Sequence, residues 1–120
     1  MNLLERLQWL YFCDTQKGVI IDRLMGERAD RVFFDDMPAR AYARYREVEV
    51  AVDGGSVRLP AHNMIWAAAH GRWPGAGMAL DHLNNDVQDN RLCNLAEVTA
   101  AENRRRGRIR RFVYLLHAGP

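Results

Sequence analysis

The sequence has few cysteines and no long hydrophobic run. Its two cysteines, Cys13 and Cys93, are distant in the chain and have no Cys or His neighbour at the spacing of a zinc site. We expect two reduced, buried thiols in a cytoplasmic protein, because disulfides are rare in that compartment. The longest uncharged stretch, residues 59–71, is shorter than the roughly 20 residues that span a bilayer. Glu5 and Arg6 interrupt the apolar N-terminus, so we do not expect a signal peptide or a membrane partner.

Internal repeats, low-complexity segments and interdomain linkers are also absent from the 120-residue sequence. A chain of this length is expected to form one domain, and a hydrophobic content of 48% is typical of a globular protein. We predict a single domain over residues 1–111 and a C-terminal tail over residues 112–120. The tail is apolar, and the sequence leaves open whether it packs on the domain or contacts a partner.

Positive charge is concentrated near the C-terminus. Six of the 17 Lys and Arg residues lie between Arg104 and Arg111, so the first 103 residues carry 11 basic groups against 15 acidic ones. A concentrated basic segment is typical of a surface that binds a polyanion. The alternative is a solvated helix face that serves solubility.

Local sequence patterns predict an α+β fold of short helices and antiparallel strands. Residues 83–94 are dense in Asn and Asp, which predicts a structured loop built on side-chain turns. Thr99 and Glu102 have the spacing of a capping box at a helix start. The predicted elements are a helix at 2–12, a strand at 19–21, mostly loop over 22–41, a hairpin from 45 to 59 that turns at 53–56, a helix at 62–70, strands at 78–80 and 95–98, and a helix from 100 to at least 106.

One group of polar residues suggests a reaction. Asp81 and His82 stand at the end of a predicted strand, Asn94 follows twelve residues after His82, and Asn103 follows nine residues later. Hydrolysis of a phosphodiester needs a deprotonated water and stabilisation of the developing negative charge. A neutral histidine, with an ordinary pKa of about 6.5, takes up such a proton near neutral pH. Carboxylate and amide oxygens suit Mg²⁺ or Mn²⁺.

Side chains alternate along a strand, so Asp81 and His82 start on opposite faces. Both serve one site only if the strand ends or bulges there. The Asn-rich loop that begins at Leu83 permits this. A helix packed across the two strands would bring Asn103 back toward Asp81.

The same residues carry a family resemblance. The segments AHNMIW, GRWP, DHLNNDVQDNRLCNLAEVT and AEN occur in register, and LQWLYFCDTQKGVI precedes them. Together they resemble the HNH endonucleases, the ββα-metal nucleases, in the form found in phage and intron-encoded enzymes. The resemblance extends to about residue 106 and implies a ββα-metal core near residues 76–106, supported by helices and a small antiparallel sheet.

The resemblance also implies roles for individual residues. Asp81 would be a metal ligand, His82 the general base and Asn103 a second metal ligand, with one divalent ion, most simply Mg²⁺. Asn94 and Asn90 would be structural residues at the site. The residues expected to contact DNA are Arg91, Arg104, Arg105, Arg106, Arg108 and His62, although Arg91 and His62 also suit structural roles.

Two positions depart from the family pattern. Asn63 and Ala96 stand where an Arg is usual, which removes positive charge from the expected DNA-facing surface. We therefore expect a monomeric or weakly dimeric endonuclease for double-stranded DNA, with RNA as another candidate substrate. The alternative is a DNA- or protein-binding module on the same fold that does not cleave. Only nine residues follow Arg111, so we expect low target specificity, or specificity set by a protein partner.

Overall fold

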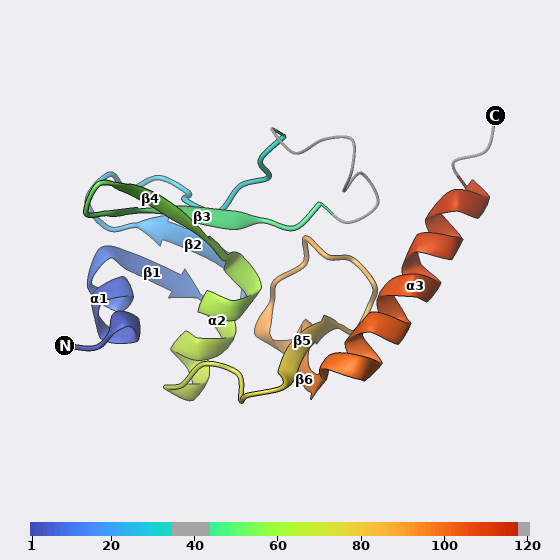
Figure 1. The fold of residues 1–120 in the computed structure, drawn as a ribbon. Coiled ribbons are helices and arrows are strands. Elements are labelled where there is room, and N and C mark those ends of the chain that lie inside the picture. The colour runs from blue at the N-terminus through green and yellow to red at the C-terminus, as the bar shows by residue number, and fades with distance from the viewer. Residues whose placement is uncertain (35–43, 118–120) are drawn as a thin grey trace.

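The computed structural model describes the backbone of residues 1–34 and 44–117, and the side chains of these residues up to residue 108. Part of the predicted loop, residues 35–41, lies outside the described residues, as does the end of the tail. The elements follow one another along the chain as shown in Figure 1. They are α1 (Leu3–Leu10), β1 (Tyr11–Asp14), β2 (Val19–Asp22), β3 (Glu47–Val52), β4 (Gly55–Pro60), α2 (Ala61–His70), β5 (Met78–His82), the short 3₁₀ turn η1 (Leu92–Asn94), β6 (Leu95–Thr99) and α3 (Ala100–His117).

The strands form three separate two-stranded antiparallel sheets, β1-β2, β3-β4 and β5-β6. The α+β class predicted from the sequence is confirmed. The expected single supporting sheet is instead two hairpins, because β2 and β3 do not pair as neighbouring strands in the described part of the chain. The third hairpin and α3 form the C-terminal ββα unit, and α3 packs against both β5 and β6.

One hydrophobic core joins the N-terminal hairpins to the ββα unit. Leu7, Ile20, Val48, Ile65 and Leu95 are all buried in it. They come from α1, β2, β3, α2 and β6, so α2 lies in the middle of the molecule with neighbours on both sides (Figure 1). The hairpins are therefore a fixed support for the ββα unit.

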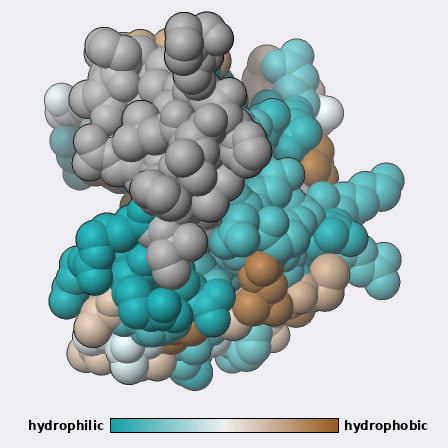
Figure 2. All heavy atoms as spheres, turned by 90° about the vertical axis from the view of Figure 1, so that its right-hand side faces the viewer, coloured by the Kyte–Doolittle hydropathy of each residue, from teal (hydrophilic) through white to brown (hydrophobic). Residues whose placement is uncertain are grey.

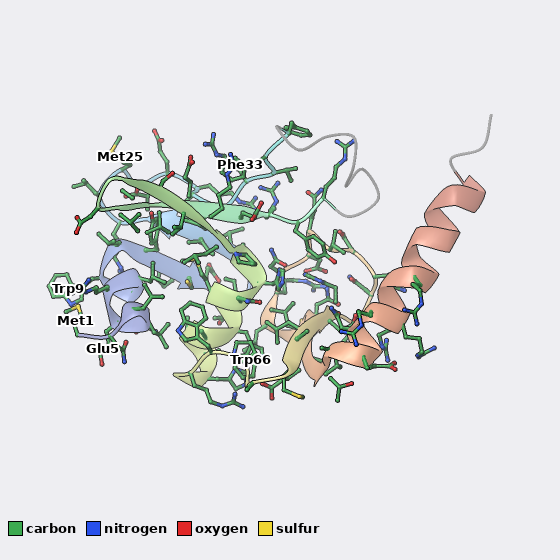
Figure 3. The ribbon with its side chains drawn as sticks, in the orientation of Figure 1. Met1, Glu5, Trp9, Met25, Phe33 and Trp66 are labelled. Carbon is green, nitrogen blue, oxygen red and sulfur yellow. The ribbon has the colours of Figure 1, made fainter. Side chains whose placement is uncertain are left out.

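Two tryptophans differ sharply in burial. Trp66 on α2 is 4% exposed and belongs to the core, whereas Trp9 on α1 is 72% exposed. Trp9 and Met1 project from the end of the molecule opposite α3 (Figure 3). Phe33 lies above the β3-β4 hairpin, where the guanidinium groups of Arg31 and Arg58 lie over its ring.

Three local predictions were wrong. The first helix ends at Leu10 rather than at residue 12, because Tyr11–Asp14 pairs with Val19–Asp22 as a strand, although its apolar residues continue the helical spacing. The helical spacing of Ile65, Trp66 and Ala69 predicts that all three share the buried face of α2, but Ala69 is exposed. Cys13 and Cys93 are both free thiols, yet Cys93 is exposed because it lies on the surface side of η1.

The helix that begins at Ala100 is longer than the minimum expected. Its start is capped by Thr99, whose Oγ1 accepts a hydrogen bond from the Glu102 backbone nitrogen at 3.2 Å. It continues to His117, so residues 112–117 of the predicted tail are helical. Neither α3 nor any other helix in the described part of the chain combines the length and the apolar character needed to cross a membrane.

A turn near the N-terminus supports the loop between β5 and β6. The backbone nitrogen of Leu92 donates a hydrogen bond to the carbonyl of Thr15 at 2.9 Å. Gly18 has a φ of +68°, and a Cβ at this position would overlap the backbone nitrogen of Arg91 and lie 2.5 Å from the carbonyl carbon of Asn90. Only glycine meets both requirements without strain. The turn at residues 14–18 therefore fixes the backbone at residues 90–92.

Candidate active site

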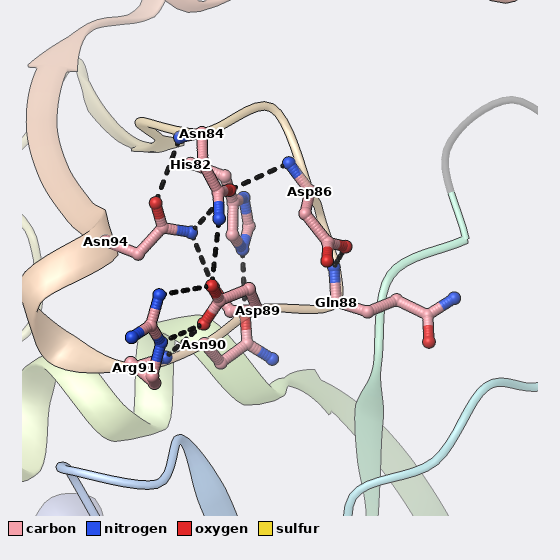
Figure 4. Close-up of polar contacts among 8 residues, drawn as sticks. All are labelled: His82, Asn84, Asp86, Gln88, Asp89, Asn90, Arg91 and Asn94. Carbon is pink, nitrogen blue, oxygen red and sulfur yellow. Dashed lines mark hydrogen bonds and ion pairs between the residues drawn. The ribbon is translucent and has the colours of Figure 1, made fainter.

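Asn and Asp side chains shape the loop between β5 and β6 (Figure 4). Asn94, which is 5% exposed, accepts a hydrogen bond from the Asn84 backbone nitrogen at 2.9 Å. Its amide nitrogen donates to the side-chain oxygen of Asn84 at 2.9 Å and to the carbonyl of Asp89 at 2.8 Å. Asn94 thus closes the loop by bonding to residues near both of its ends.

Arg91 belongs to the same network. Its Nε and Nη2 atoms each donate to the carboxylate of Asp89 at 2.8 Å. These bonds lower the pKa of Asp89 to about 2. The Arg91 side chain is still 49% exposed, so it holds the loop and also presents positive charge to solvent.

Asp81 and His82 are the last two residues of β5, which was predicted to end at residue 80; both pair with β6 in regular register, so the strand ends only after His82. They are 1% and 2% exposed. Their partners come from different elements. Asp81 Oδ2 lies 3.2 Å from Nη1 of Arg106 on α3, whereas His82 contacts the loop and α2.

Asn90 fixes the imidazole of His82. Its Oδ1 lies 2.7 Å from His82 Nε2, and Asn90 is only 1% exposed. An amide oxygen only accepts hydrogen bonds, so Nε2 is the donor. The neutral imidazole then carries its proton on Nε2 and its lone pair on Nδ1. This arrangement makes Nδ1 the atom of His82 that can act as a base.

His62 lies beside His82 rather than on the outer surface of the basic helix. The ring centroids are 5.0 Å apart with the rings edge to face, and the Tyr45 ring lies 5.5 Å from His62 and 6.1 Å from His82. Burial, and to a lesser degree the neighbouring His82, lowers the pKa of His62 to about 3. Its Nδ1 is buried and has no hydrogen-bond partner among the described residues. His62 is therefore a neutral ring that packs against the candidate base.

A pocket of about 550 Å³ adjoins this cluster. His62 and Tyr45 line one part of it, and Asn103 from α3 lines another. Leu80, the residue before Asp81, also lines it, so the pocket lies next to the buried pair. Asn63, one of the two departures from the family pattern, also lines the pocket.

The arginines of α3 divide into two groups. Arg104 and Arg108 are exposed. Arg105 pairs with Glu102 at 2.8 Å, and Arg106 bridges Glu102 at 3.0 Å and Asp81 at 3.2 Å. These arginines, chiefly Arg105, lower the pKa of Glu102 to about 2. Most of the described surface on the side of α3 is hydrophilic (Figure 2).

The oxygen donors at the site are few but suit a hard divalent cation. Among the described residues, no cluster of three or more His, Cys, Asp or Glu side chains is placed to bind a metal ion. Asp81 offers a buried carboxylate that already faces a cation, the Arg106 guanidinium. Asn103 offers an amide oxygen at the adjoining pocket. One carboxylate and one amide fit an ion such as Mg²⁺, which keeps several water ligands.

Comparisons with known proteins agree with this geometry. Residues 59–105 match the family model described as HNH endonuclease. No curated protein matches the sequence. Among solved structures, the chain is similar to the HNH homing endonuclease I-HmuI, from work on its DNA binding and cleavage, with a TM-score of 0.63 and 17% identity. The match covers 89% of this chain and 56% of that one, so this chain spans little more than half of that protein. The shared ββα fold and the family match confirm the resemblance seen in the sequence, and the segment 59–105 belongs to the HNH endonuclease family.

Proposed function

We propose that this protein is a metal-dependent DNA endonuclease of phage or prophage origin that hydrolyses phosphodiester bonds in double-stranded DNA. The observation that carries the proposal is the bond between His82 Nε2 and Asn90 Oδ1. It orients the ring of a buried histidine, with the proton on Nε2, and this histidine is adjacent in the chain to a buried carboxylate.

His82 Nδ1 takes a proton from a water molecule, and the resulting hydroxide attacks the phosphorus in line with the leaving oxygen. The bond between phosphorus and the 3′ oxygen breaks, and the 3′ oxygen takes up a proton from a second water molecule. The products are a 5′-phosphate and a 3′-hydroxyl. Asn90 keeps the imidazole in the required tautomer, and His62 limits rotation of the ring by packing against it.

Asp81 and Asn103 would hold one divalent cation, with Mg²⁺ the first choice and Mn²⁺ a second. Such an ion stabilises negative charge on the scissile phosphate and the leaving oxygen. The remaining coordination positions would go to water and to DNA, which explains why two protein ligands are sufficient.

Flanking phosphates would lie along α3. Arg104, Arg105 and Arg108 are exposed there, although Arg105 is paired with Glu102, and Arg91 adds charge from the loop. Each phosphate that such a group neutralises makes binding more salt-sensitive. One site per chain favours nicking by a monomer or by a weak dimer. Double-strand cleavage would need two chains or two successive nicks.

The second candidate is a module that binds DNA by the same surface without cutting it. The ion pair between Arg106 and Asp81 favours this reading, because it places a guanidinium against the carboxylate that a metal would need. Asn63 and Ala96 favour it too, since they reduce positive charge near the site. A binding module should bind DNA without any metal.

The experiment is cleavage of supercoiled plasmid DNA with Mg²⁺ or Mn²⁺, with excess EDTA as the control. The endonuclease should produce nicked circles only with metal, and the new ends should be a 5′-phosphate and a 3′-hydroxyl. Asn103→Ala should lower the rate, whereas Ser56→Ala, on the distant β3-β4 hairpin, should cut like the parent. Retention of DNA in gel shifts without any nicking would instead favour the binding module. Cleavage of RNA but not of DNA would indicate an RNA nuclease instead.

A further inference from the structure

Arg106 has two acidic partners on different elements. It lies three residues after Asn103, so the two side chains share one face of α3. Its Nε is 3.0 Å from Oε1 of Glu102, and its Nη1 is 3.2 Å from Oδ2 of Asp81. The Asp81 side chain is 1% exposed, whereas Arg106 is 39% exposed, so the guanidinium reaches from a buried carboxylate to the surface.

This position places Arg106 in competition with a metal ion. A divalent cation bound to Asp81 would put two like charges next to each other in a poorly hydrated site, where their repulsion is strong. Arg106 would therefore have to leave Asp81. Glu102 is one turn away and is also paired with Arg105, so it does not fully replace the lost partner. A DNA phosphate does, because it accepts two parallel hydrogen bonds from a guanidinium.

We propose that Arg106 is a positioning residue that pairs with Asp81 in the metal-free protein and moves to a DNA phosphate when a divalent cation binds. DNA and metal then bind cooperatively, and the metal site is complete only when substrate is present. This rests on the proposed function, since it takes Asp81 as a metal ligand. It also explains how Asp81 can pair with Arg106 and still be the carboxylate that we assign to a metal ion.

The test is calorimetric titration of Mn²⁺ with and without a saturating DNA duplex, in a His82→Ala background that leaves the DNA intact. Without DNA, Arg106→Gln should bind Mn²⁺ about tenfold more tightly than the parent, a typical size for coupling between two sites. DNA should tighten Mn²⁺ binding about tenfold in the parent and much less in Arg106→Gln. Arg31→Gln is the control, because Arg31 pairs with Glu49 on β3 and not with Asp81 or Glu102, and it should behave like the parent.

Equal Mn²⁺ affinity of Arg106→Gln and the parent would overturn the proposal. If Arg106→Gln does not fold, the parent alone provides the test, because coupling is reciprocal and Mn²⁺ must tighten DNA binding by the same factor. Absence of that effect would also overturn it. Asp81→Asn distinguishes a failure of the coupling from a failure of the metal site. Loss of Mn²⁺ binding in Asp81→Asn with no effect of Arg106→Gln would refute only the coupling, whereas unchanged binding in Asp81→Asn would refute the metal site itself.

Discussion

The hydrogen bond between Asn90 and His82 makes a quantitative prediction about catalysis. Asn90→Ala removes the acceptor for a buried N–H group, and a buried group left without its partner costs about 1–3 kcal/mol. The imidazole then loses most of its preference for the tautomer and orientation that expose the Nδ1 lone pair. Since each 1.4 kcal/mol changes a rate about tenfold, kcat should fall by a factor of about 5 to 150 if the whole cost appears in the rate. KM for DNA should change little, because Asn90 is 1% exposed and does not contact substrate.

The assay is single-site nicking of a plasmid at several DNA concentrations, so that kcat and KM are resolved. Asn90→Asp is the matched variant, since a carboxylate of the same shape still accepts the bond from Nε2. It should keep most of the activity that Asn90→Ala loses. An equal loss in the two variants would mean that Asn90 does not act by accepting the hydrogen bond from His82 Nε2. Full activity of Asn90→Ala would refute the assignment of Nδ1 as the base.

Three further predictions concern stability and DNA binding. Gly18→Ala should lower the free energy of unfolding, measured with urea, by about 1–3 kcal/mol, because φ is +68° and the new Cβ meets the backbone of the β5-β6 loop. Gly26→Ala is the control and should lower it less, because Gly26 also has a positive φ but has open space around it. His62 has a pKa near 3 in the folded protein and about 6.5 when unfolded, so the unfolded chain binds more protons between these values. Stability should therefore fall as pH drops below about 6.5, by at most about 1.4 kcal/mol per unit, and His62→Gln should remove that part of the slope. Arg108→Gln should make the slope of log K against log salt less negative by about 0.9 on duplex DNA, and an unchanged slope would mean that Arg108 contacts no phosphate.

Most of the fold follows from local sequence signals. The hairpin turn, the helix that ends before Gly71 and the cap at Thr99 each depend on residues close together in the chain, and all were predicted. The turn is shorter than expected: it takes only residues 53–54, because residues 55 and 56 already pair with β3. The strand β1 was not, because Tyr11 and Phe12 fit a helical pattern as well as a strand. Its pairing with β2 is a tertiary choice, and such choices override local propensity.

The candidate site divides in the same way. Asp81, His82, Asn94 and Asn103 could be selected from the sequence because their spacing matches a chemical requirement and a family pattern. The contact of Gly18 with the loop, by contrast, joins segments more than 70 residues apart. No periodicity signals such a contact.

The sequence also did not predict which acidic residue each arginine of α3 pairs with. A basic segment predicts where cations gather, but it does not tell which of them turns inward. Arg106 pairs with a buried carboxylate and Arg104 is exposed, although the two are only two residues apart on the same helix. Their difference follows from the 3.6-residue helical repeat and from how α3 packs on β5.

The central claim is that His82 is the base of a metal-dependent phosphodiester hydrolysis. The measurement that tests it most directly is plasmid nicking with Mg²⁺ under single-turnover conditions, comparing the parent with His82→Ala at equal DNA occupancy. The account predicts that the parent cuts and that His82→Ala binds DNA normally but cuts at least about 100-fold more slowly, since general-base catalysis contributes roughly 10²–10⁴-fold. Equal cutting by the two proteins would contradict it.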